Sequence, residues 1–160
     1  MKLFRHVPVI PQATLYAPLG AGSLIAAAIY DNHESACYEQ EDALVVEQWR
    51  SCEVLGTAAQ EVLARFCRKD RNLYGSKLTD WPAFKASRLP SVKQFEASYL
   101  RIHVMAVNEA ALIFEATAFP PEESEIALRV TFTKGNSNEE VGALLLRLVT
   151  SCIQWKQPGT

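Results

Sequence analysis

Histidine is the residue best suited to bind a metal or to transfer a proton near neutral pH. This chain has three, His6, His33 and His103, and none belongs to an HExxH pair or another short metal-ligand spacing. His103 falls on the polar side of an alternating segment, where the register we expect places it opposite Glu115, with Glu115 opposite Arg129. A His–Glu–Arg row resembles a site, but it is equally typical of an exposed sheet face. We interpret it as ordinary cross-strand pairing.

The four cysteines are candidate nucleophiles, and they form no CxxC or other compact ligand spacing: Cys37, Cys52, Cys67 and Cys152. A nucleophilic thiol needs a cation or a helix N-terminus nearby to lower its pKa. Cys67 precedes Arg68, but at the expected C-terminal end of a helix, where the helix dipole disfavours a thiolate. Because Cys52, Cys67 and Cys152 lie in helical apolar patterns, we expect buried, reduced thiols and no disulfide framework.

The segment Gly20-Ala21-Gly22 begins like a dinucleotide-binding loop. The position of the third glycine is Ile25, and no βαβ unit follows, so we interpret the segment as a turn. The chain also contains no P-loop, no GxSxG and no paired acid–base motif. We therefore expect no catalytic residue, no cofactor and no metal site.

Composition places the chain among ordinary globular proteins, with 160 residues, 49% hydrophobic, 21% charged, and a net charge of −2. That length fits a single domain over residues 1–160. The weakly acidic balance argues against a nucleic-acid partner, which usually requires a strongly basic surface. Pro8 and Pro11 interrupt any signal-peptide core, and the apolar run Leu24–Tyr30 is too short to span a bilayer. We expect a cytoplasmic protein with no membrane partner.

Charge is divided unevenly along the chain. Every charged residue of the segment 31–47 is acidic: Asp31, Glu34, Glu39, Glu41, Asp42 and Glu47. Most charged residues of the segment 65–93 are basic, and Tyr74, Trp81 and Phe84 are interleaved with them. These aromatic residues are candidates for contacting nucleic acid or protein, but we interpret them as pinning their own loop. The two charge blocks fit helix-dipole complementation and solvated loops.

Two segments have the three- and four-residue apolar spacing of helices. The first predicts a helix from Glu41 to about Lys69, with its stripe at Val45, Trp49, Cys52, Leu55, Ala59, Val62 and Phe66. In the second, the capping box Ser137-Asn138-Glu139-Glu140 begins a helix predicted over Glu139–Trp155. The connection Asn72–Ser98 is long for a compact domain, so we expect it to contain a short helix or to have a function. One or two helical turns fit Ser91–Ala97.

Strict alternation of apolar and polar residues predicts a three-stranded antiparallel meander over residues 100–106, 112–117 and 126–132. Its apolar residues are even-numbered, and cross-strand partners share a face, so the first hairpin needs a loop of odd length. The simplest is Asn108-Glu109-Ala110. Thr14–Leu19 and Ser23–Tyr30 are expected as further strands, although the alanine-rich Leu24–Tyr30 also fits a short buried helix. The sequence thus predicts an α+β fold: an antiparallel sheet that includes this meander, with two long helices packed on one face.

The segment from Val130 to Leu145 consists of a strand, a small-residue turn and a capped helix that begins S-N-E-E-V-G. It resembles the C-terminal strand–turn–helix of bacterial immunity proteins from contact-dependent growth inhibition and related polymorphic-toxin systems. The resemblance implies a small, non-catalytic cytoplasmic protein that binds a cognate toxin or effector domain and blocks it. It assigns no contact residue, because the matching segment is structural.

We take the acidic residues Asp31, Glu34, Glu39, Glu41 and Asp42 as the candidate partner-binding surface, because acidic patches attract cationic partners. The leading hypothesis is an immunity-type inhibitor. A secretion-chaperone-like adaptor is a second hypothesis, which an exposed apolar groove or a homodimer would favour. A small-ligand-binding domain or enzyme is a third, which requires a closed pocket with convergent polar groups.

Overall fold

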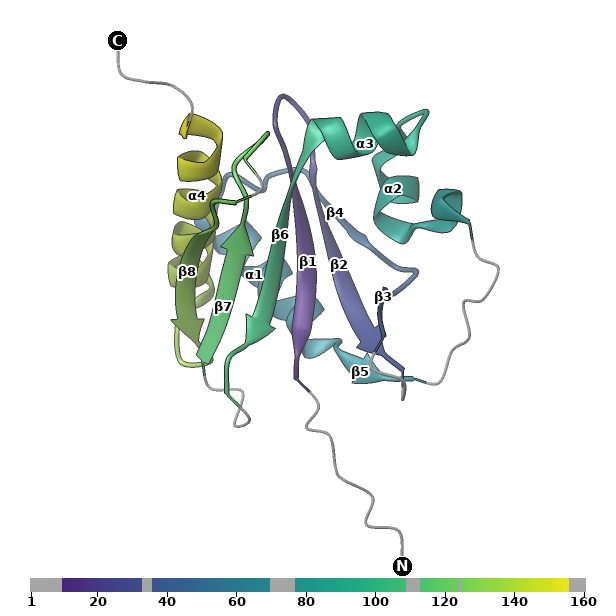
Figure 1. Cartoon of the computed structure of the whole chain (residues 1–160). Coiled ribbons are helices and arrows are strands. Elements are labelled where there is room, and N and C mark those ends of the chain that lie inside the picture. The colour runs from purple at the N-terminus through teal and green to yellow at the C-terminus, as the bar shows by residue number, and fades with distance from the viewer. Residues whose placement is uncertain (1–9, 33–35, 70–76, 109–112, 124, 156–160) are drawn as a thin grey trace, which may run out of the picture.

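The computed structural model describes residues 10–32, 36–69, 77–108, 113–123 and 125–155. The elements in chain order are β1 (Gln12–Pro18), β2 (Leu24–Asp31), β3 (Cys37–Glu39), β4 (Leu44–Val46), α1 (Cys52–Ala64), β5 (Cys67–Arg68), the 3-10 turn η1 (Leu78–Asp80), α2 (Pro82–Ser87), α3 (Val92–Ser98), β6 (Tyr99–Ala106), β7 (Ile113–Ala118), β8 (Leu128–Thr133) and α4 (Asn138–Gln154). Figure 1 shows one sheet, with α1 and α4 behind it and α2 and α3 on the side of the viewer.

The sheet runs in the order β3-β2-β1-β6-β7-β8, and neighbours along this path are antiparallel. Strand β4 also pairs with β2, and the two-residue β5 pairs with the end of β2 in parallel. The pairing of β1 with β6 joins the N-terminal hairpin to the meander of β6, β7 and β8. The predicted α+β fold, with an antiparallel sheet and a three-stranded meander, is confirmed.

Helices α1 and α4 pack against each other and against one face of the sheet, as expected for the two long helices. Between these layers lie Leu15, Leu24, Ile102, Val104, Leu55, Val62, Leu145 and Leu148 among others. The capping box at the start of α4 is confirmed. The Glu140 amide donates to the Ser137 hydroxyl (3.2 Å), and the Ser137 amide donates to the Glu140 carboxylate (2.8 Å).

On the other face of the sheet, the described helices α2 and α3 cover β1 and β2, where they pack on Tyr16, Ile25 and Ala27. Strand β2 is therefore buried on both faces, which explains its unbroken apolar sequence and confirms a strand rather than a helix. Strands β6 and β7 keep the predicted alternation, because no described helix covers their outer side. Trp81 and Phe84 belong to the α2–α3 cluster, as expected of aromatics that pin their own loop, while Tyr74 lies outside the described residues.

The predicted helix from Glu41 to Lys69 is wrong at both ends, because α1 spans only Cys52–Ala64. Residues 44–46 form β4 on the edge of β2, where they gain backbone hydrogen bonds that the edge of β2 offers. Trp49, which continued the helical stripe, instead donates its indole N–H to the Gly22 carbonyl (3.1 Å). Tertiary pairing here outweighs helical spacing.

The parity of the first meander hairpin is confirmed, but the predicted register is wrong. His103 lies opposite Thr117 rather than Glu115, and Met105 lies opposite Glu115. The Val107 amide donates to the Ile113 carbonyl (2.9 Å), so the loop is odd but longer than the simplest three-residue turn, whose Glu109 and Ala110 lie outside the described residues. A shift of two residues keeps every side chain on its face, so alternation alone cannot exclude it.

Candidate protein-binding site

The acidic segment, residues 31–47, begins at the end of β2 and then runs along the β2 edge of the sheet (Figure 1). Strand β3 pairs Glu39 with Ile29, and β4 pairs Leu44 with Ala26. Between these pairs the edge chain has four residues, 40–43, where β2 has two, Ala27 and Ala28. In this β-bulge Glu41 and Asp42 are exposed, whereas Ala43 packs against the cluster beneath α2 and α3. We call residues 40–43 the acidic bulge.

Hydrogen bonds of Gln40 hold the first residue of the acidic bulge in place. Its side-chain amide donates to the carbonyl of Ile29 (3.2 Å) and to that of Arg65 (2.8 Å), and its backbone amide donates to the Ala28 carbonyl (2.7 Å). The Arg65 guanidinium donates to the Asp42 carbonyl (3.1 Å) from the end of α1. The Arg65 bond uses the backbone carbonyl of Asp42, and the Asp42 side chain remains exposed.

Glu39 and Asp31 lie in the same segment but are engaged inside the molecule. The Tyr16 hydroxyl donates to one Glu39 oxygen, and the Ala83 amide donates to the other (3.1 Å), which ties β3 to the start of α2. Burial raises the pKa of the Tyr16 phenol far above its ordinary value, and the negative charge of Glu39 raises it further. Asp31 pairs with Arg68 at 3.1 Å, with side-chain exposures of 14% and 25%.

The predicted contact residues therefore divide into groups. Glu41 and Asp42 are exposed on the acidic bulge. Asp31 and Glu39 hold the surrounding segment in place, and Glu34 lies outside the described residues. Sequence reasoning missed the internal roles of Asp31 and Glu39, because their partners Arg68, Tyr16 and Ala83 are distant in the chain.

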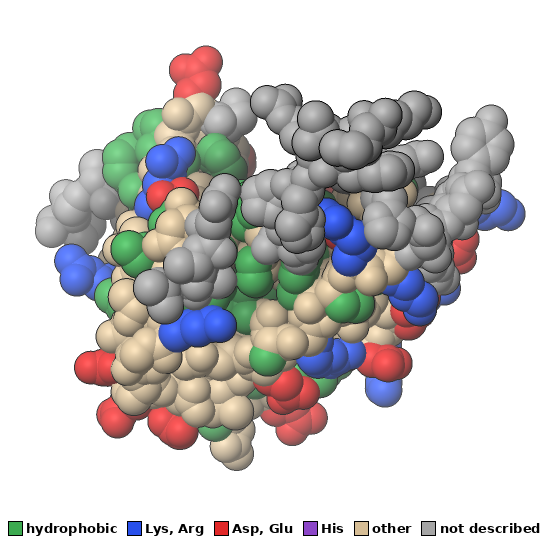
Figure 2. Space-filling view, turned by 90° about the horizontal axis from the view of Figure 1, so that it is seen from below, with side chains coloured by type: hydrophobic (Ala, Val, Ile, Leu, Met, Phe, Trp, Pro, Cys, Tyr) green, Lys and Arg blue, Asp and Glu red, His purple; other side chains and the backbone are tan. Residues whose placement is uncertain are grey.

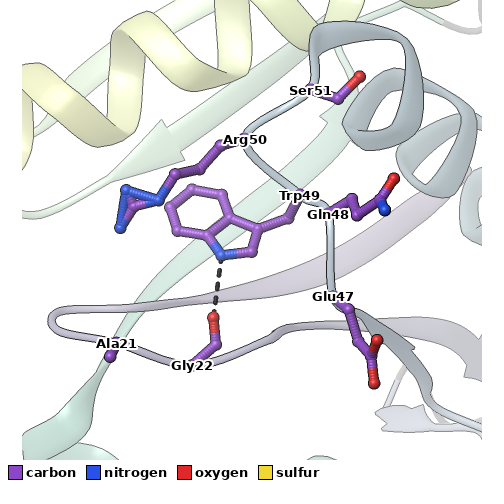
Figure 3. A pocket seen from close by; sticks show the side chains of 7 residues that line it. All are labelled: Ala21, Gly22, Glu47, Gln48, Trp49, Arg50 and Ser51. Carbon is purple, nitrogen blue, oxygen red and sulfur yellow. Dashed lines mark hydrogen bonds between the residues drawn. The ribbon is translucent and has the colours of Figure 1, made fainter.

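An open hollow of about 600 Å³ lies beside the Gly20–Gly22 turn and the start of α1. In Figure 3 the Trp49 side chain points to Gly22, and the Arg50 guanidinium carbon lies 4.7 Å from the indole centre. The segment 20–22 is thus a hairpin turn, as expected. Arg50 and Glu47 supply opposite charges at this rim, but neither is buried. Because Trp49 itself is buried, the hollow offers a surface cation rather than an enclosed pocket.

His103 is half-buried on the outer face between Thr14 and Thr117, the residues opposite it in β1 and β7. Burial lowers the pKa of His103, and the positive charge of Arg101 lowers it further. The Glu115 carboxylate contacts Arg129 diagonally, at 3.8 Å, and accepts from the Thr117 hydroxyl (3.1 Å). The predicted direct His103–Glu115–Arg129 row is wrong, and the structure shows a surface ion pair with a histidine beside it.

The four cysteines are free. Cys152 is buried, as predicted, whereas Cys52, which was also expected to be buried, is only half-buried. The prediction for Cys67 is wrong: α1 ends before it, and the residue is exposed in β5. Cys37 is also exposed, and its thiolate or thiol sulfur accepts from the Gln12 side-chain amide (2.8 Å). Among the described residues no group of three or more His, Cys, Asp or Glu side chains is placed to hold a metal ion.

No helix in the described part of the chain is long and apolar enough to cross a membrane. No known protein family and no curated protein matches the sequence. Among solved structures, a protein of unknown function from Neisseria meningitidis, NMB0488, aligns with a TM-score of 0.67 and 13% identity over 95% of this chain and 99% of its own. A chain of the CdiA-CT/CdiI toxin and immunity complex from Yersinia pseudotuberculosis aligns with a TM-score of 0.64 and 11% identity, over 89% of this chain and 97% of its own. At such identities the likeness establishes a shared fold.

Proposed function

We propose that this chain is an immunity-type inhibitor, a non-catalytic protein that binds a cognate toxin or effector domain in the cytoplasm and blocks it. The observation that carries this proposal is the match, over 89% of the chain, to a chain of a toxin and immunity complex. The segment whose sequence resembles immunity proteins corresponds to β8, the following turn and the capped start of α4. A resemblance in sequence pattern and a likeness in fold thus both support this proposal.

We further propose that the partner contacts the acidic segment represented by Asp31, Glu34, Glu39, Glu41 and Asp42, with the acidic bulge as its outermost part. The Gln40 amide and the Asp42 carbonyl are both hydrogen-bonded, so the backbone of the bulge has less freedom to lose on binding. Exposed carboxylates on an edge attract a cationic partner and speed its approach. The internal bonds of Asp31 and Glu39 keep that segment in place.

A binding measurement with the domain encoded directly beside this gene tests the function. The two proteins are purified separately, and calorimetry is followed by an assay of the domain's own activity with increasing amounts of the chain. We expect a stoichiometric complex and loss of activity at equimolar chain. A toxin domain from an unrelated system is the control and should not bind. Absence of a complex at micromolar concentrations of both proteins would refute the proposal.

A further inference from the structure

Ile10, Val107 and Ile113 are exposed hydrophobic residues that the fold brings into one row. The Ala106 amide donates to the Pro11 carbonyl (2.9 Å), and continuing the β1–β6 register places Ile10 opposite Val107. The Val107 amide donates to the Ile113 carbonyl, so these two residues are also neighbours. Their exposed fractions are 37%, 50% and 40%. We call these three residues the apolar row.

The apolar row lies on the outer face of the sheet, the one that α1 and α4 do not cover. Val107 and Ile113 have the odd parity of His103 and Glu115, whereas the core residues of β6 and β7 are even-numbered. Helices α2 and α3 pack on β1 and β2 near Tyr16 and Ile25, toward the other end of these strands. These three β-branched side chains are adjacent rather than scattered singly, and no described helix covers them.

Charged residues of both signs surround this end of the molecule. Figure 2 looks onto it and shows hydrophobic side chains near the centre, with Asp, Glu, Lys and Arg side chains around them. Thr133 pairs with Ile113, so the exposed Lys134 follows directly on one side. Glu139 lies beyond it, in the first turn of α4. Asp31 ends β2 at the same end, on the other side. An apolar centre with a charged rim is the anatomy of a protein–protein interface.

We propose that the apolar row is the anchor of the partner interface, filled by aliphatic or aromatic side chains of the cognate domain, and this rests on the proposed function. Its continuity with Asp31, the first residue of the acidic segment, allows one partner to contact both. The acidic segment speeds association, and burial of the apolar row slows dissociation. A rim of mixed charge fits a protein better than an anionic lipid surface, which recruits faces rich in Lys and Arg.

The test compares Val107→Asp/Ile113→Asp with Phe119→Asp in the full chain. Phe119 is the matched control: it is exposed to the same degree, 50%, and lies just beyond the opposite end of β7. Binding of the neighbouring-gene domain is measured by interferometry, and folding by thermal melting. We expect the double variant to bind at least tenfold more weakly, mainly through faster dissociation, and the control to bind within twofold of the unchanged chain. Val107→Ser provides a milder change if the double variant melts early.

Binding of the double variant at full strength, with the unchanged chain binding normally, would overturn this inference and leave the proposed function standing. Failure of the unchanged chain to bind overturns both. Two further measurements identify other occupants. If sedimentation shows that the unchanged chain is a dimer and the double variant a monomer, the apolar row belongs to an interface with a second copy of the chain. Loss of binding to phosphatidylglycerol vesicles in the double variant would assign it to lipid. Either result overturns the assignment to the cognate domain.

Discussion

The backbone carbonyl of Cys52 in α1 occupies the space that a side chain at Gly142 in α4 would need, because a β-carbon built on Gly142 would lie 1.8 Å from that oxygen. The reverse contact is also present: a β-carbon on Gly56 of α1 would lie 1.7 Å from the Asn138 carbonyl oxygen. The two long helices thus cross with a glycine from each against the backbone of the other. This close approach sets the distance between them and therefore the shape of the core below.

Replacing Gly142 with alanine should destabilise the protein, although alanine in a helix normally gains ~0.5–1 kcal/mol over glycine. The new methyl group would overlap backbone, which cannot move aside as a flexible side chain can. We expect a loss of about 2 kcal/mol or more in urea denaturation. Gly20→Ala is the matched control, because a β-carbon there meets nothing within 4 Å. Equal stability of the two variants would contradict the close crossing.

Replacing Ser137 with alanine removes the acceptor for the Glu140 amide and should cost about 0.5–2 kcal/mol. Leu145→Ala should cost more, ~2–5 kcal/mol, because that side chain is fully buried between α4 and the sheet. Denaturant titrations of both variants give the comparison. A cap variant that is less stable than the Leu145 variant would show that the assignment of the core face of α4 is wrong.

Thiol labelling should separate the four cysteines into classes. Cys67 and Cys37 are exposed and should react with maleimide in the native protein, Cys37 more slowly because burial raises the pKa of its thiol. Cys152 is buried, and burial raises its pKa to about 11, so it should react only when the protein unfolds. Mass spectrometry of peptides after timed labelling measures each rate. Early modification of Cys152 under native conditions would contradict its placement.

His103 should make the stability depend on pH below neutrality. Burial, followed by Arg101, lowers its pKa in the folded state, while the unfolded chain keeps a value of about 6.5. The unfolded state therefore binds the proton first, and stability falls as the pH drops from about 7 through 6.5 toward the folded pKa. An NMR titration of the imidazole should have its midpoint below 6.5, and His103→Asn should flatten the pH dependence. A midpoint above 6.5 would reverse the sign and refute this account.

Charge reversal at Glu41 and Asp42, both to lysine, should slow association with the cognate domain while the melting temperature stays nearly constant. Exposed charges contribute little to folding but strongly influence encounter rates. The difference should grow at low salt, where screening is weakest. Glu61→Lys/Glu96→Lys changes the net charge equally at exposed positions on α1 and α3, and should slow association less. Stopped-flow rates that are equal for both double variants would remove the acidic bulge from the interface.

The predictable parts of the fold are those in which the local sequence pattern and the tertiary contacts favour the same structure. Alternation in β6, β7 and β8 follows from one covered face, and the Ser137–Glu140 capping box marks a helix start without help from distant residues. The start of α1 was not predictable, because Val45 and Trp49 fit a helical stripe equally well. Only the edge of β2, which lies earlier in the chain, makes residues 44–46 a strand.

The exposure of part of the acidic segment was predictable, but the partners of its individual carboxylates were not. A run of acidic residues in sequence indicates a charged surface, and Glu41 and Asp42 are indeed exposed. Whether a given carboxylate serves a partner or the fold depends on residues that arrive from elsewhere, as Tyr16 and Ala83 do at Glu39. The apolar row was equally hidden, since its three members come from separate segments and only the register aligns them.

The β1–β6 pairing has a consequence for the order of events during synthesis. Strand β1 leaves the ribosome long before β6, at ~5–20 residues per second, so for several seconds the early hairpin has one edge without its final neighbour. Helix α1 is likewise synthesised before α4, the helix against which it packs. The nascent N-terminal half is therefore exposed to mispairing and to chaperones until β6 and α4 have been synthesised. The described fold is therefore complete only once α4 has been made, because both the edge of β1 and one face of α1 depend on segments that are synthesised later.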